Sequence, residues 1–145
     1  MMKFIKNKLK EEKGLTLIEL LAVIVILAII AAIAIPAIGN IIQNSRENAV
    51  IADAQNVLSA ANLYFSEKGK EKTVTADALI TAGYLESKGK LTTATVTNDS
   101  PDTITFTGEA GNKTASASGA TAATLSEDGR GALTITDGAP AEPGE

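Results

Sequence analysis

The sequence predicts an α+β protein in which one long N-terminal helix packs on a small antiparallel β-sheet head. Three patterns predict this fold: an uncharged apolar run from Leu20 to Gly39, an amphipathic stretch directly after it, and alternating Thr, Val and Ile from Leu91 onward. A chain of 145 residues with 45% hydrophobic residues has room for one membrane helix and one small domain. Because the chain contains no cysteine, packing rather than disulfides must stabilise the head.

The N-terminal residues predict one membrane span with a fixed orientation. The 20 residues from Leu20 to Gly39 would form a helix of roughly 30 Å, the thickness of a bilayer's hydrocarbon core. Residues 1–14 hold five lysines and two glutamates, a net charge of +3, whereas residues 15–145 hold eight basic and fifteen acidic residues, net −7. Lysines next to a span mark its cytoplasmic side, so the N-terminus is expected inside and the acidic remainder outside.

Glu19 is an ionisable residue at the threshold of this span, which makes it a functional candidate. One alternative is an ordinary secretory signal peptide cut after Ala32-Ile33-Ala34, but its apolar core would be only about 7 to 15 residues long. A second alternative is a simple signal anchor whose Glu19 extends to the headgroups. Neither alternative explains the string from Lys13 to Glu19.

That string, KGLTLIE, together with the apolar run and Pro36, resembles the N-terminal signature of type IV pilins and of the pseudopilins of type II secretion and competence systems. The resemblance covers about residues 13–65. It implies that a prepilin peptidase cuts between Gly14 and Leu15 and that Leu15, where the family commonly has Phe, becomes the N-methylated first residue. It also implies that Glu19 and the new terminus at Leu15 act in subunit assembly.

The resemblance divides the helical part into a cleaved basic leader at 1–14, a transmembrane and filament-core helix at 15–39, and an amphipathic helix at 40–67. Pro36 lacks an N–H, which leaves the carbonyl of Ala32 without its helical partner, and Gly39 adds backbone freedom. A kink or locally melted turn is therefore expected between Pro36 and Gly39. The resemblance implies that this segment can extend when subunits leave the membrane.

The amphipathic helix carries an apolar stripe with alternating spacings of three and four residues, which predicts the face that packs on the head. The stripe contains Val50, Ile51, Ala54, Val57, Leu58, Ala61, Tyr64 and Phe65.

The head is expected at 68–137, followed by a flexible tail at 138–145. A short helix is predicted from about Thr75, its N-cap, to Ala82, with Gly83 closing it so that Tyr84 packs back on Leu79. Residues 79–85 also resemble an LxxxGYL segment of Gram-positive-type pilin heads. Four strands are predicted at 91–97, 103–107, 113–118 and 132–136, as an antiparallel meander. Residues 117–124 have few large apolar side chains and are expected to form a surface loop.

The residues exclude several classes of chemistry. Without His or Cys, nucleophile systems that need either residue and the usual zinc sites are ruled out, and no phosphate-binding loop motif is present. A calcium site at Glu127, Asp128 and Asp137 and glycosylation at two Asn-x-Ser/Thr strings are weaker readings. The sequence predicts no enzyme, no cofactor and no resident metal.

Direct binding of nucleic acid is also disfavoured. A rim of lysines at positions 68, 70, 72, 88 and 90 is interspersed with Glu67, Glu71 and Glu86, and the exported part is net negative.

The sequence thus predicts the structural subunit of a type IV pilus-like filament for adhesion, motility or a related surface task. The precursor would span the membrane once, in contact with lipid, and the mature form would lie in a cell-surface homopolymer. Its expected partners are copies of itself, prepilin peptidase, and an inner-membrane assembly platform with its ATPase. Two alternatives stay open: a pseudopilin of a secretion or competence (DNA uptake) system, and an anchored binding domain that does not polymerise.

Overall fold

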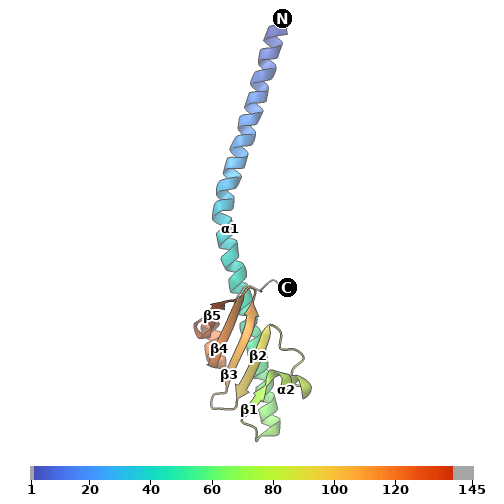
Figure 1. Ribbon diagram of the computed structural model, residues 1–145, viewed down its shortest axis with the longest axis vertical. Coiled ribbons are helices and arrows are strands. Elements are labelled where there is room, and N and C mark those ends of the chain that lie inside the picture. Colours follow the sequence, from blue (N-terminus) through green and yellow to red (C-terminus); the bar gives the residue numbers. More distant parts are fainter. Residues whose placement is uncertain (1, 139–145) are drawn as a thin grey trace, which may run out of the picture. The chain divides into compact units, whose positions relative to one another are not determined.

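The computed structural model describes residues 2–138, except for the side chains of Glu127 and Asp128 (Figure 1). Helix α1 (Met2–Lys68) is followed by strand β1 (Thr73–Thr75), helix α2 (Ala76–Thr81), strands β2 (Leu91–Thr97), β3 (Thr103–Ala110) and β4 (Lys113–Thr121), helix α3 (Ala122–Asp128), a 3-10 turn η1 (Gly129–Ala132) and strand β5 (Thr134–Asp137). The chain divides into two compact units, Met1–Ile41 and Ile42–Glu145. We call the second the globular unit.

The first unit consists of the N-terminal part of α1. The helix is continuous through Gly14, Pro36 and Gly39, so the backbone contains no melted turn between Pro36 and Gly39. Whether these two residues allow extension during assembly stays a prediction. The basic residues before Gly14 are helical as well, which means that leader and apolar run form one helical segment.

The globular unit contains a five-stranded antiparallel sheet with the order β1-β2-β3-β4-β5. The predicted meander is therefore confirmed. Val96 lies opposite Ile104 and Ala94 opposite Phe106 between β2 and β3, and Phe106 lies opposite Ala117 between β3 and β4. Strand β1, only three residues long and paired with β2 through Val74 and Val96, was not predicted. A strand this short carries too little alternation to be recognised.

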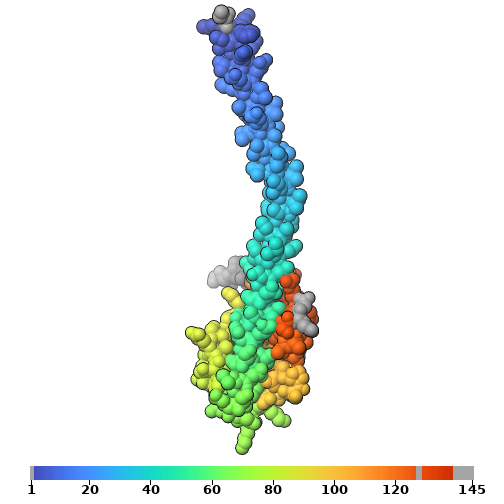
Figure 2. All heavy atoms as spheres, turned by 180° about the vertical axis from the view of Figure 1, so that it is seen from behind, coloured from blue at the N-terminus to red at the C-terminus, as the bar shows by residue number. Residues whose placement is uncertain are grey.

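The C-terminal part of α1 packs on one face of this sheet (Figures 1 and 2). The helix contributes Val50, Val57 and Leu58 to a core in which Ile104 and Phe106 of β3 are fully buried. The predicted apolar stripe is confirmed as a packing face, although Tyr64 is only partly buried. Gly108 permits close approach, because a Cβ there would lie 2.9 Å from Cγ1 of Val50.

The expected surface loop at 117–124 was wrong. Strand β4 continues to Thr121, and α3 begins at Ala122. The small residues that suggested a loop are instead required by packing, since Ala117 and Ala120 are buried against the core. Thr121 then caps α3 in a reciprocal box with Thr124, whose hydroxyl accepts a hydrogen bond from the Thr121 N–H at 2.9 Å. Of the predicted tail, residues 139–145 lie outside the described part of the chain.

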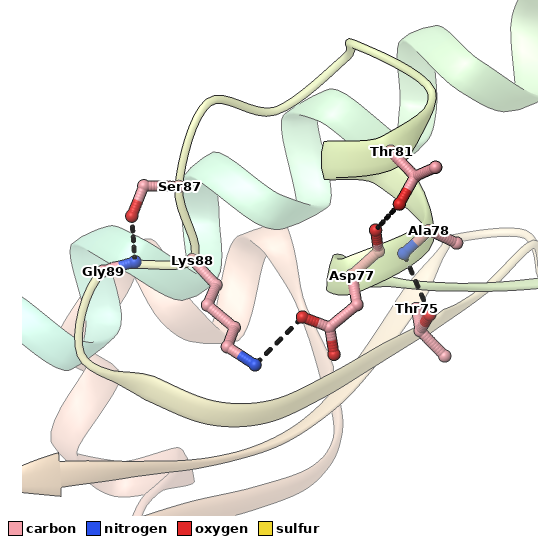
Figure 3. Close-up of polar contacts among 7 residues, drawn as sticks. All are labelled: Thr75, Asp77, Ala78, Thr81, Ser87, Lys88 and Gly89. Atoms are coloured by element: carbon pink, nitrogen blue, oxygen red, sulfur yellow. Dashed lines mark hydrogen bonds and ion pairs between the residues drawn. The ribbon is translucent and has the colours of Figure 1, made fainter.

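Helix α2 forms as predicted. The Thr75 hydroxyl accepts a hydrogen bond from the Ala78 N–H at 3.2 Å, which caps the N-terminus (Figure 3). Gly83 has φ of +82°, and the Tyr84 N–H donates to the Leu79 carbonyl at 3.0 Å. The left-handed glycine is what lets the chain reverse after α2 and begin the connection to β2.

Candidate processing and assembly segment

The predicted cleavage site, the Gly14–Leu15 bond, lies within α1 at a position where the helix surface is exposed. Gly14 is partly exposed, Leu15 is 60% exposed, and no atom lies within 4 Å of a Cβ built on Gly14. The Thr16 hydroxyl donates to the carbonyl oxygens of Lys13 at 3.0 Å and Glu12 at 3.3 Å. The Gly14–Leu15 bond is thus sterically accessible on the surface of α1.

Glu19 lies four residues after Leu15, about one helical turn away, and its side chain is exposed. Among residues 2–138, apart from the side chains of Glu127 and Asp128, the ion pairs are Lys88 with Asp77 and Lys113 with Asp137, and neither includes Glu19. A carboxylate without an ionic partner beside an apolar helix is costly to place in hydrocarbon.

Apolar side chains cover most of the helix surface from Leu15 to Ile42. No residue in the most hydrophobic 18-residue segment of this helix is buried. By length and composition this is the one helix in the described chain that could cross a membrane. An apolar surface all round a helix is typical of a membrane span or of a helix packed among others. The same surface can therefore serve in the bilayer and in a bundle of identical helices.

A family model named the prokaryotic N-terminal methylation motif matches residues 9–35. The chain carries this methylation motif. The match covers the end of the leader, the Gly14–Leu15 bond, Glu19 and most of the apolar run, and it indicates a protein of the type IV pilin or pseudopilin-like class. No curated protein and no solved structure matches the chain.

The methylation motif agrees with the fold and gives it a functional context. A long apolar helix continuing into a segment packed on an antiparallel sheet is consistent with the type IV pilin fold. The motif and the apolar helix together support a membrane-anchored precursor, and the motif points to a structural subunit.

The globular unit holds polar contacts that the sequence did not predict, in the connection between α2 and β2. Asp53 of α1 accepts a hydrogen bond from the Lys90 N–H at 2.7 Å, and a Cβ on Gly89, whose φ is +59°, would lie 2.2 Å from the Asp53 Oδ2. Lys88 pairs with Asp77 at 3.0 Å, and Ser87 Oγ accepts from the Gly89 N–H at 3.1 Å (Figure 3). These contacts fix the connection against α1 and α2.

Two tyrosines form a second polar cluster near the end of α1. The Tyr64 and Tyr84 rings meet edge to face with centroids 5.3 Å apart. The Tyr64 hydroxyl donates to Glu71 at 3.0 Å, and the Tyr84 hydroxyl donates to Glu67. Each hydrogen bond to a carboxylate raises the pKa of its tyrosine above the ordinary value of 10.0, with smaller contributions from desolvation and from the charge of the same carboxylate.

The calcium candidates lie partly outside the described part of the chain. Within residues 2–138, apart from the two undescribed side chains, no three acidic groups are placed to hold a metal ion. Asp137 instead pairs with Lys113 at 3.4 Å, and the side chains of Glu127 and Asp128 lie outside the described part. Among the lysines at positions 68, 70, 72, 88 and 90, Lys88 forms an ion pair with Asp77, which lowers the positive charge available to a phosphate backbone.

Proposed function

We propose that this chain is the precursor of a type IV pilus-like filament subunit, cut after Gly14, N-methylated at Leu15 and polymerised through α1 into a cell-surface homopolymer. The observation that carries the proposal is the methylation motif at residues 9–35. It lies in a helix with an exposed apolar surface, and Glu19 has no ion pair with any described residue. Adhesion or motility is the expected task of the filament. A prepilin peptidase, an assembly platform and its ATPase are the expected partners.

Cleavage after Gly14 would create a positive charge that can pair with the Glu19 carboxylate. The new amino terminus at Leu15 is an ammonium group one helical turn from the carboxylate, and each charge alone would cost roughly 3 kcal/mol near the centre of a membrane helix. Glu19 can pair with its own terminus, where it also favours the positive end of the helix dipole. It can also reach the terminus of a neighbouring subunit, which would fix one axial register between helices. The second arrangement makes charge neutralisation depend on assembly.

Removing the Glu19 carboxylate tests this role. The variant Glu19→Ala should be cleaved at Gly14 normally and yet form few or no filaments, because an uncompensated ammonium in a helix bundle costs several kcal/mol per subunit. Glu19→Asp, one methylene shorter, should be intermediate. Glu12→Ala removes a carboxylate that is discarded with the leader, and this control should assemble like the wild type.

Immunoblots for cleavage and electron microscopy of sheared surface material give the two readouts. Normal filaments from a cleaved Glu19→Ala subunit would contradict the intersubunit role. Loss of cleavage in this variant would instead place Glu19 in recognition by the peptidase.

The methylation motif is equally compatible with a pseudopilin of a secretion or competence system. Such a subunit would form a short fibre below the cell surface, so the same sheared material would contain no filaments although cleavage had occurred. A non-polymeric anchored domain would give neither filaments nor dependence on Glu19.

A further inference from the structure

The sheet face turned away from α1 carries an unusual side-chain pattern. The buried residues of β1 to β4 and the partly buried Ile135 of β5 lie on the side of α1. The alternate positions, none of them buried, are almost all threonine. Strand pairing aligns these residues into rows, and one row crosses four strands through Thr73, Thr97, Thr103 and Thr121. We call the outward positions of β1 to β5 the threonine face.

Neighbouring rows repeat the pattern in register. Thr95 lies opposite Thr105 between β2 and β3, and Thr107 lies opposite Ser116 between β3 and β4. The alternation also determines where the charges lie. Among the described outward positions, Glu109 at one end of the sheet is the residue that carries a charge. Lys113 and Asp137 lie on the opposite face of the sheet, together with Ala115 and Ile135.

Such a face departs from the usual composition of an exposed sheet. Solvated sheet surfaces and edges generally carry Lys and Glu, which prevent sheets of different molecules from associating. Charged residues are instead depleted where proteins bury surface against one another. Threonine is β-branched, so its side chain loses little rotamer entropy when it is covered, and its hydroxyl can pair with another hydroxyl or with a bridging water.

We propose that the threonine face is the surface through which copies of this chain associate laterally, joining one filament to the next. Residues 15–145 carry a net charge of −7, so two copies repel each other unless they meet through a surface that is free of charge. Apart from Glu109 at one end of the sheet, the threonine face is such a surface, and its uncharged part can contact the same part of a second copy. This inference rests on the proposed filament function.

The size of the face indicates how strongly one pair of copies would associate. With strands about 4.8 Å apart and a rise of about 3.3 Å per residue, five strands present on the order of 400–500 Å² per copy. Two copies would then bury on the order of 1,000 Å², below the roughly 1,200 Å² at which stable interfaces begin. A single pair is therefore weak, and only the repetition of the contact along a filament gives stable bundles.

The threonine face is not covered by α1 within the globular unit. In the globular unit, α1 covers the other side of the sheet, as the two opposite views show (Figures 1 and 2). The residues of the threonine face are therefore available to another copy without displacing the part of α1 that packs on the sheet.

The test introduces charge at the centre of the face in the full-length chain. The double variant Thr95→Lys with Thr105→Lys should still form filaments. The fraction of filaments that sediments as bundles at low speed should fall about tenfold or more. A roughly tenfold loss of affinity at each contact has a large effect because the contact is repeated along the filament. These lysines reduce the net negative charge, so a loss of bundling cannot come from stronger overall repulsion. The matched control, Ala78→Lys with Thr81→Lys on exposed positions of α2, makes the same charge change elsewhere.

Wild-type bundles should also persist when ionic strength rises to about 0.5 M, because an uncharged contact is not screened. The variant Thr95→Val with Thr105→Val keeps the shape and neutrality of the face, and bundling should be retained. Equal bundling by the two lysine double variants, or dissolution of wild-type bundles by salt, would overturn the inference. Filaments that never bundle would overturn it while leaving the proposed function intact, whereas absence of wild-type filaments would refute the proposed function.

Discussion

Single residues fix the connection between α2 and β2 through contacts across long sequence distances. Asp53 and Lys90 are 37 positions apart, and the carboxylate accepts the Lys90 N–H only because Gly89 leaves space for it. The left-handed φ of Gly89 adds a second requirement for glycine. The conformation of this connection therefore depends on the absence of one Cβ.

Gly89→Ala should destabilise the globular unit by about 1–3 kcal/mol, because the new Cβ would meet the Asp53 carboxylate and the left-handed backbone would be strained. Thermal unfolding of the full chain in detergent measures this loss. Gly131→Ala is the matched control, since Gly131 has no neighbouring atom within 4 Å of a Cβ and no positive φ. Equal stability of the two variants would contradict this prediction, because it would mean that the connection between α2 and β2 accommodates the new Cβ without a loss of unfolding free energy.

The two tyrosines predict a dependence of stability on alkaline pH. Hydrogen bonds to Glu71 and Glu67 raise the pKa of Tyr64 and Tyr84, so the folded chain retains these protons at pH values where the unfolded chain loses them. Their stabilisation is fully present below pH 10, the ordinary tyrosine pKa, and is lost as pH rises through the raised values.

The double variant Tyr64→Phe with Tyr84→Phe should thus lose less stability than the wild type between about pH 9 and pH 11. Thermal unfolding followed at several pH values in this interval compares the two slopes. Identical slopes would mean that the tyrosines titrate as they do in the unfolded chain.

At the scale of elements, α1 performs two tasks with one continuous helix. Its N-terminal part exposes apolar residues, and its C-terminal part buries Val50, Val57 and Leu58 against the sheet. The sheet has mostly threonine on its other face, so its core depends on the helix. Removing apolar atoms from α1 should therefore affect the whole globular unit.

Leu58→Ala should lower the free energy of unfolding by about 2–5 kcal/mol, because the side chain is 3% exposed and its removal leaves a cavity. Leu63→Ala makes the same chemical change on the same helix at a residue that is 55% exposed, and it should be nearly neutral. Denaturant unfolding in detergent compares the two. A small effect of Leu58→Ala would mean that the sheet retains a core of its own.

The sequence predicted those elements whose signal is local. The alternation in β2 and β3, the cap and left-handed glycine around α2, and the apolar stripe of α1 are all readable within short windows. Helix α3 was missed, because the small residues before it resemble a loop until Ala117 and Ala120 are seen to be buried. The glutamate contacts of the tyrosines and the rows of the threonine face require pairing between distant segments, which no short window shows.

At the scale of the whole molecule, the chain combines a processing motif, a membrane-compatible helix and a folded unit in one sequence. The motif segment could be identified from its residues because Gly14, Leu15 and Glu19 lie within six positions of one another and beside an apolar run. The proposed filament function is argued from the motif, and the threonine face is described from the sheet. The two inferences therefore rest on different parts of the chain.

The central claim is that the chain is processed and polymerised through its N-terminal helix, and the mass of the polymerised subunit tests it most directly. Filaments sheared from cells and examined by intact mass spectrometry should contain a chain that begins at Leu15 and carries one added methyl group. A polymer built from chains that begin at Met1, or that begin at Ile35 after cleavage behind Ala34, would contradict the claim.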